Sequence, residues 1–282
     1  MTPTRTETGS EPQLRPWGPD SLSWSAGIDW RAVLTSRVAI LMQVAHPVVG
    51  AGVMDHSEFL EDRWARITAT AASARRFSGL EGPDAAIDEG QRLREMHANI
   101  KGVDAHGRKY HALNADAYLW VAATGYWSSA TIRRVHNAEL DDAQEDMLYA
   151  EWTDQARVLR IPDRVIPATR SDFWEYVEHT VSNVLERNSC TDLLIELDRH
   201  PLPRHPKFPL PTPFWNAMAI PLAALLRLAT SGYLPEELRD RLGIKWDSGR
   251  DRQFSTLVSI TNGMDKVLPD RARHPLLART TR

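Results

Sequence analysis

The sequence predicts an all-α fold, and three observations support this. Apolar residues recur with helical spacing through most of the chain beyond residue 27. No convincing pair of alternating strands, βαβ rhythm or internal repeat is present. With 282 residues, of which 42% are hydrophobic, the chain can build one large core. We therefore expect a single globular multi-helix domain over residues 28–282. Residues 1–27 are polar and punctuated by proline and glycine, so we expect them to form a flexible tail.

The first expected helix runs from Asp29, which can cap it, to Pro47, where the missing backbone donor bends or breaks the chain. A second helix is expected over residues 61–77. Pro83 opens a third, which ends near Gly102 because proline favours the first turn and glycine the end of a helix. The turn-rich segment that follows, VDAHGRKYHALN, could form a short hairpin before residue 115.

The second half of the chain continues the helical pattern. Helices are expected over residues 115–137, 140–160 and 171–187, the last capped by Ser171. The proline-rich segment from His200 to Pro213 is expected to be an extended linker. Three more helices are expected: a very apolar one over residues 214–230, a short one opened by Pro235, and one over residues 249–266.

Composition excludes several classes of protein. The net charge is −3, so no global positive field favours a nucleic-acid partner. Cys190 is the single cysteine, which rules out an intramolecular disulfide, a CxxC redox pair and a cysteine zinc site, and which fits a cytoplasmic location. We expect neither a signal peptide nor a transmembrane segment. The ten tryptophans indicate bulky packing and are compatible with an apolar cavity.

Familiar catalytic motifs are absent. The Gly50-x-Gly52 pair follows a helical run and lacks a third glycine, so it is not a dinucleotide-binding loop. We interpret the two glycines as positions where another backbone or a flat ligand comes close. The chain also lacks HExxH, paired ExxH helices, GxSxG and CxxCH, which excludes the corresponding zinc, di-iron, serine-hydrolase and covalent-haem sites.

Two histidines lie in apolar surroundings. His46 sits within VAILMQVAHPVVGAGVMDHSEF, either as a core histidine beside a proline kink or facing a cavity that needs an imidazole. His97 shares a helical face with Ile87, Leu93 and Ile100. It is either a satisfied core residue or a metal ligand, and an apolar setting suits axial ligation of haem iron.

The helix before His97 presents a stripe formed by Arg66, Thr70, Ser73 and Phe77, with small residues around it. Such a stripe either allows close helix packing or forms a flat wall for a planar cofactor. In the second case Arg66 and Thr70 would be hydrogen-bond donors above that cofactor. A buried arginine would then need a carboxylate, a propionate or a polarised oxygen ligand as its partner.

The order of three segments resembles a known family. QVAHPVVGAGVMDHSEF, then RWARITATAASARRFSG, then REMHANIKGVDAHGRKYHALNADAYLWVAAT is similar to the MpaB-type oxygenase family, which includes the catalytic domain of rubber oxygenase (latex clearing protein). The later segments YAEWTDQARVLRIP and SGYLPEELRDRLGIKW agree with it. The resemblance extends roughly from Trp30 to Pro269, nearly the whole expected domain.

The resemblance implies an all-helical domain with a non-covalent haem b in its interior. The family's iron-binding histidine lies in a motif like REMHA, which makes His97 the implied axial ligand and His46 a second choice. Arg66 and Thr70 match an arginine and a threonine, four residues apart, on the opposite side of the family's haem. Rubber oxygenases carry a lysine just before that threonine, whereas this chain has Ala69, which puts polymer cleavage in doubt.

The expected function is therefore that of a haem b-dependent oxygenase acting with O₂ on a hydrophobic small molecule. His97 would hold the iron, and Arg66 and Thr70 would polarise oxygen on the opposite side. One alternative is a haem- or lipid-binding helical protein without turnover, and another is a structural helical protein with satisfied core histidines. The substrate, the electron donor, the oligomeric state and the role of His56 stay open.

Overall fold

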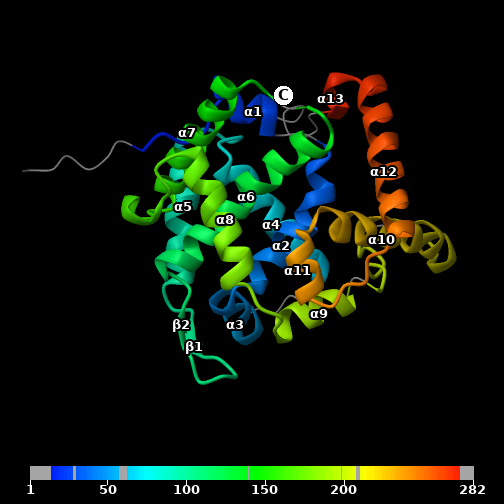
Figure 1. Ribbon diagram of the computed structural model, residues 1–282, viewed down its shortest axis with the longest axis horizontal. Helices are drawn as coiled ribbons and strands as arrows, with labels where there is room; N and C mark the ends of the chain where they lie inside the picture. The colour runs from blue at the N-terminus through cyan, green and yellow to red at the C-terminus, as the bar shows by residue number, and fades with distance from the viewer. Residues whose placement is uncertain are drawn as a thin grey trace, which may run out of the picture.

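The structure, a computed structural model, describes residues 14–27, 30–56, 62–138, 140–197, 199–207 and 210–273. Within these residues the fold is helical apart from one two-stranded sheet, so the predicted all-α class is confirmed (Figure 1). The helices of the first half are α1 (Leu22–Gly27), α2 (Ala32–Ala45), α3 (Pro47–His56), α4 (Arg63–Phe77), α5 (Pro83–His97) and α6 (Ala115–Val135). Those of the second half are α7 (Asp142–Val158), the 3₁₀ turn η1 (Asp163–Val165), α8 (Arg170–Asn183), α9 (Ser189–Leu197), α10 (Thr212–Tyr233), α11 (Glu236–Arg241), α12 (Ser248–Val267) and α13 (Asp270–Arg273).

Helix α2 occupies the centre of the molecule, where it packs against α6, α10 and α3. Its buried side includes Val38, Met42 and Ala45. The indole of Trp120 on α6 donates to the Met42 carbonyl at 2.9 Å, which ties the two helices together inside the core. The central pair therefore combines apolar burial with a satisfied indole.

The chain turns by 98° between α2 and α3, at His46 and Pro47. This confirms the break predicted at Pro47, whose ring cannot continue the hydrogen-bond pattern of α2. The expected cap Asp29 lies outside the described residues. Within the part of the chain that the structure describes, no single helix is both long enough and apolar enough to cross a membrane, and only α2 and α3 taken together, with their sharp bend, have that length and composition.

Aromatic side chains fill the layer between α6, α7 and α8. Tyr126, Trp152 and Phe173 meet edge-on or tilted, with ring centroids 4.9–5.7 Å apart. Such arrangements suit the ring quadrupoles and add to the effect of burial. The buried tryptophans of this layer thus serve packing, as one of the two interpretations of the tryptophan content anticipated.

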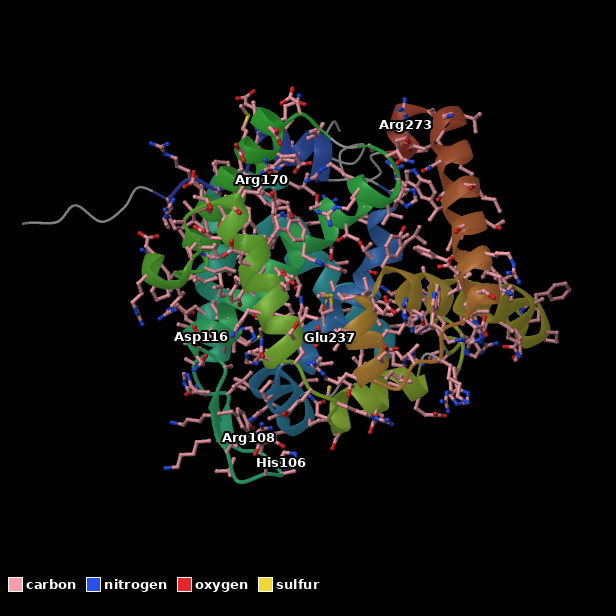
Figure 2. The ribbon with its side chains drawn as sticks, in the orientation of Figure 1. His106, Arg108, Asp116, Arg170, Glu237 and Arg273 are labelled. Carbon is pink, nitrogen blue, oxygen red and sulfur yellow. The ribbon has the colours of Figure 1, made fainter. Side chains whose placement is uncertain are left out.

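The predicted hairpin is present as the antiparallel strands β1 (Lys101–Val103) and β2 (Lys109–His111), with Gly102 opposite Tyr110. It projects from the body below α3 (Figure 1). Arg108, labelled in Figure 2, pairs with Asp104 at 2.6 Å and with Glu186 at 2.6 Å. These ion pairs fasten the hairpin to the segment between α8 and α9.

Several details differ from the sequence-based expectations. The helix opened by Pro83 ends at His97 rather than near Gly102, and Lys101–Val103 form strand β1 instead. Helix α8 is capped by Thr169 rather than Ser171, because a reciprocal capping box with Asp172 satisfies two backbone donors at once. Helix α9 was not expected. Within the expected flexible tail, α1 packs on α7, where Glu151 accepts the backbone N–H groups of Leu22 and Ser23 at 2.8 and 2.7 Å.

Candidate functional site

Helices α4 and α5 carry the three predicted site residues and pack as an antiparallel pair. Near the middle of α5, the carboxylate of Glu89 accepts from Ser73 at 2.5 Å and from Arg92 at 2.5 and 2.8 Å, and it lies 3.4 Å from Nε of Arg76. We call Ser73, Arg76, Glu89 and Arg92 the Glu89 cluster. The Glu89 side chain is 1% exposed, so the cluster joins α4 to α5 through a buried charge.

His97 is the last residue of α5, and its ring is half-buried. Its Nδ1 lies 2.6 Å from the carbonyl oxygen of Leu93. A carbonyl oxygen can only accept, so Nδ1 carries the proton of the neutral ring. The lone pair is then on Nε2, and none of the described residues hydrogen-bonds to that atom. This is the tautomer that a metal-ligating histidine needs.

The surroundings of His97 favour the neutral ring. Burial lowers its pKa, the bond to Leu93 opposes this, and the charges of Arg66 and Arg92 lower the pKa further. The Tyr118 ring meets His97 edge-on at 5.9 Å. Burial also raises the pKa of Tyr118 to about 12, so this neighbour stays neutral at physiological pH. The electrostatic setting therefore keeps His97 a lone-pair donor rather than a cation.

Arg66 and Thr70 both lie on α4, one helical turn apart, and both are exposed. The electrostatic effect of Arg66 on His97 places the two residues in one neighbourhood. None of the described α4 residues is fully buried, and Ile67 is 44% exposed. Arg66 thus does not need the buried counter-ion that the sequence-based reasoning required. The predicted stripe on α4 is not uniformly buried, because Ser73 and Phe77 are half-buried whereas Arg66 and Thr70 are exposed.

His46 has the opposite character. It is 7% exposed at the bend between α2 and α3, and the backbone N–H of Val48 donates to its Nδ1 at 3.3 Å. Nδ1 is therefore the acceptor and Nε2 carries the proton of the neutral ring. Burial lowers its pKa to about 4, although the carboxylates of Asp116 and Glu186 pull it upward (Asp116 is labelled in Figure 2). His46 is therefore a buried, neutral histidine whose Nδ1 is satisfied by the backbone, whereas none of the described residues accepts from its Nε2–H. The burial and the Nδ1 bond favour the core interpretation of the two that the sequence left open.

Gly50 and Gly52, the two glycines after His46, differ in how closely other atoms approach them. A Cβ at Gly50 would meet the Val44 carbonyl oxygen at 2.5 Å and Nδ2 of Asn188 at 2.7 Å. Gly50 is therefore a place of close approach by the protein itself. At Gly52 the nearest atom, Cγ2 of Ile100, would lie at an ordinary 3.4 Å.

Other possible ligands are arranged less suitably. His56 is exposed and meets Tyr110 only edge-on at 6.4 Å. In the described ranges, no group of three or more histidine, cysteine, aspartate or glutamate side chains could hold a bare metal ion. A hollow of about 430 Å³ lies between α8 and α11, near the labelled Glu237. Another, of about 500 Å³, is lined by Trp246 and its neighbours in the chain. Neither includes His97, Arg66 or Thr70.

Glu89 was not predicted from the sequence. The expected buried stripe of this helix contained Ile87, Leu93, His97 and Ile100. The first three are half-buried, Ile100 lies beyond the end of α5, and the buried face is formed by Ala86, Glu89 and Gly90. The small residues at spacings of three and four around a single glutamate were the available signal. Tyr118 was also missed because it lies one element away in the sequence.

Comparisons with known proteins identify one family and two mycobacterial relatives that match most of the chain. The family described as "ER-bound oxygenase mpaB/B'/Rubber oxygenase, catalytic domain" matches residues 24–262. Two mycobacterial relatives, "Uncharacterized protein Rv2237" of Mycobacterium tuberculosis and "Uncharacterized protein Mb2261" of Mycobacterium bovis, are each 25% identical over 248 residues. The match covers 85% of this chain and 91% of each relative. No solved structure matches significantly.

Proposed function

This chain belongs to the mpaB and rubber oxygenase catalytic-domain family, and we propose that it is a haem b-dependent oxygenase acting on a hydrophobic small molecule. Membership supports oxygenase chemistry with O₂ in general. The haem, the kind of substrate and the roles of individual residues are the proposal. The observation that carries it is the tautomer of His97, whose Nδ1 is held by Leu93 and whose Nε2 lone pair is not engaged by any of the described residues.

The residue types around His97 support this proposal because they are chemically compatible with a bound haem. A single neutral imidazole suffices as an axial protein ligand, and His97 supplies one with its orientation fixed by a backbone carbonyl. The neighbouring Tyr118 and half-buried Leu93 offer apolar surface beside that ring. Bound haem would supply the redox chemistry with O₂ that amino-acid side chains lack.

Arg66 and Thr70 would act on the same reaction by placing donors near His97. Arg66 carries a permanent positive charge, and the Thr70 hydroxyl is a neutral donor one turn further along α4. Donors of this kind stabilise negative charge that develops on an oxygen atom during a reaction. Their exposure leaves both side chains free to reach a ligand, because none of the hydrogen bonds among the described residues holds either one.

The test is a titration of purified apoprotein with haemin, followed by absorption near the Soret band. Wild type should bind haemin, and His97→Ala should bind at least about tenfold more weakly, since one axial bond is lost. His46→Ala is the matched control, and it should keep the wild-type affinity. Unchanged haemin binding by His97→Ala would contradict the assignment.

Turnover distinguishes an oxygenase from a carrier of haem or lipid. The haem-loaded, reduced protein should consume O₂ faster when hydrophobic organic compounds are added. Arg66→Ala and Thr70→Val should retain haemin binding but slow that consumption, by on the order of a hundredfold for the arginine. Oxygen consumption that no compound stimulates would favour the non-catalytic alternative.

A further inference from the structure

Helix α10 begins in an unusual environment for so apolar a segment. Of residues 212–222, only Trp215 and Ala219 are buried. Phe214 is 69% exposed, Met218 51% and Leu222 48%, and Ile220, on another side of the helix, is 55% exposed. This segment contains no charged residue. We call it the α10 face, and it lies at the edge of the molecule (Figure 1).

An apolar helix exposed on most sides normally has a partner, since scattered exposed side chains are common but contiguous apolar surface is not. Two hydrogen bonds from tryptophan indoles fix the linker beside the α10 face. The Trp215 indole donates to the Leu202 carbonyl at 3.0 Å, and the Trp64 indole donates to the Pro203 carbonyl at 2.8 Å. The linker before α10 is therefore fixed beside the first turn of the helix.

Positive charge lies on either side of this uncharged face along the chain, mainly in the linker before α10. From Arg199 to Pro235 the chain contains Arg199, Arg204, Lys207 and Arg227 but no aspartate or glutamate, although the whole protein has a net charge of −3. Arg204 and Lys207 are exposed, and neither forms an ion pair with any of the described residues. They follow directly after the two anchored carbonyls, so exposed cations flank exposed apolar side chains.

We propose that the α10 face and the linker before it bind to an anionic lipid surface. Apolar side chains would enter the boundary between headgroups and acyl chains, while Arg204 and Lys207 meet the headgroup phosphates. Charge decides between this partner and a second copy of the chain. A two-fold dimer through the face would bring the same uncompensated cations together, which is unfavourable. An anionic membrane complements both the charge and the apolar surface.

The test is sedimentation of the full chain with vesicles of phosphatidylcholine alone or with about a third phosphatidylserine. Binding should need the anionic lipid and should weaken as salt is raised. Arg204→Glu combined with Lys207→Glu should lower partitioning by about tenfold or more, because each basic residue near the surface contributes about fivefold. Phe214→Ser combined with Met218→Ser should also lower it by about tenfold or more.

The matched control lies on the hairpin, far from α10. Val103 is 57% exposed and Lys109 is exposed, so Val103→Ser combined with Lys109→Glu changes the same kinds of side chain. This control should bind like wild type. Failure of wild type to bind anionic vesicles would overturn the proposal, as would an equal loss in the control. A wild-type dimer that Phe214→Ser and Met218→Ser dissociate, without vesicle binding, would assign the face to a second copy instead.

Discussion

The bend between α2 and α3 and the end of α5 each contain a histidine among apolar residues, yet they treat the imidazole in opposite ways. At the bend, a backbone N–H donates to Nδ1 of His46. At the end of α5, a backbone carbonyl accepts from Nδ1 of His97. The first arrangement places the remaining proton on Nε2, and the second places the lone pair there. The backbone partner, together with the degree of burial, therefore distinguishes His46 from His97.

The largest effect should come from acid at the bend. The pKa of His46 is lowered to about 4, from about 6.5 in an unfolded chain, so the unfolded state takes up the proton first. Stability from this residue is complete above pH 6.5 and is lost as pH falls toward 4, by about 3 kcal/mol in all. Urea unfolding of wild type and His46→Gln across this range should show that loss only in wild type. If the free energy of unfolding fell equally with pH in both proteins, His46 would not be held as a buried neutral residue.

A slightly smaller effect is expected at the Glu89 cluster, which holds α4 against α5 and so supports the region of His97. Glu89→Ala removes charge-assisted bonds to Ser73 and Arg92 and should lower the free energy of unfolding by about 2–3 kcal/mol. The figure stays moderate because Arg92 is 53% exposed and can be hydrated. Glu95, exposed on the same helix, is the control, and its alanine variant should stay within about 0.5 kcal/mol of wild type.

The two glycines of α3 test how tightly the bend is closed. Gly50→Ala should destabilise by about 1–3 kcal/mol, because the new methyl group would meet the Val44 carbonyl and Asn188. Gly52→Ala, two residues along, should be neutral or slightly stabilising, since alanine favours helix and the space is ordinary. Thermal unfolding followed by circular dichroism measures both. Equal losses would mean that the close approach at Gly50 is unimportant.

The smallest effect on stability is expected at Arg66, on the exposed side of α4 near His97. Arg66→Ala removes an exposed cation and should change the free energy of unfolding by less than about 0.5 kcal/mol. It should nevertheless raise the pKa of His97, because Arg66 is one of the charges that lower it. NMR titration of the apoprotein measures this directly. Arg94→Ala is the control, since Arg94 acts on Tyr118 and is not among the causes of the shift at His97.

Much of the fold could be predicted from local chemistry. Pro47 marks the bend because its ring forbids a continuing helix, and the turn residues before residue 115 mark the hairpin. The cap of α8 was predicted two residues too late. Ser171 is a common capping residue, but the actual cap is Thr169, which forms a reciprocal capping box with Asp172. Helix α9 escaped notice because nine residues give little periodicity. The division of the chain at residues 27 and 28 stays a prediction.

The site was predictable in its residue types but not in its environment. Periodicity placed His97, Leu93 and Ile87 on one face, yet could not tell a half-buried face from a buried one, because that depends on which helix packs there. The contrast between His46 and His97 was beyond the sequence, since both follow apolar residues and only three-dimensional hydrogen bonding sets the tautomer. The assignments of His97, Arg66 and Thr70 stay proposals that rest on this geometry and on family membership.

The Glu89 cluster has a further consequence, for the order in which the chain folds. Its bond from Ser73 to Glu89 joins residues only 16 apart, whereas the Trp17 indole reaches the Glu151 carbonyl across 134 positions. Closing a short loop costs less entropy, so α4 and α5 can pair early, while the N-terminal segment docks only after α7 exists. We expect φ-values to be higher at Ser73 than at Trp17. The helical pair that carries His97 would then assemble before the start of the chain closes over α7.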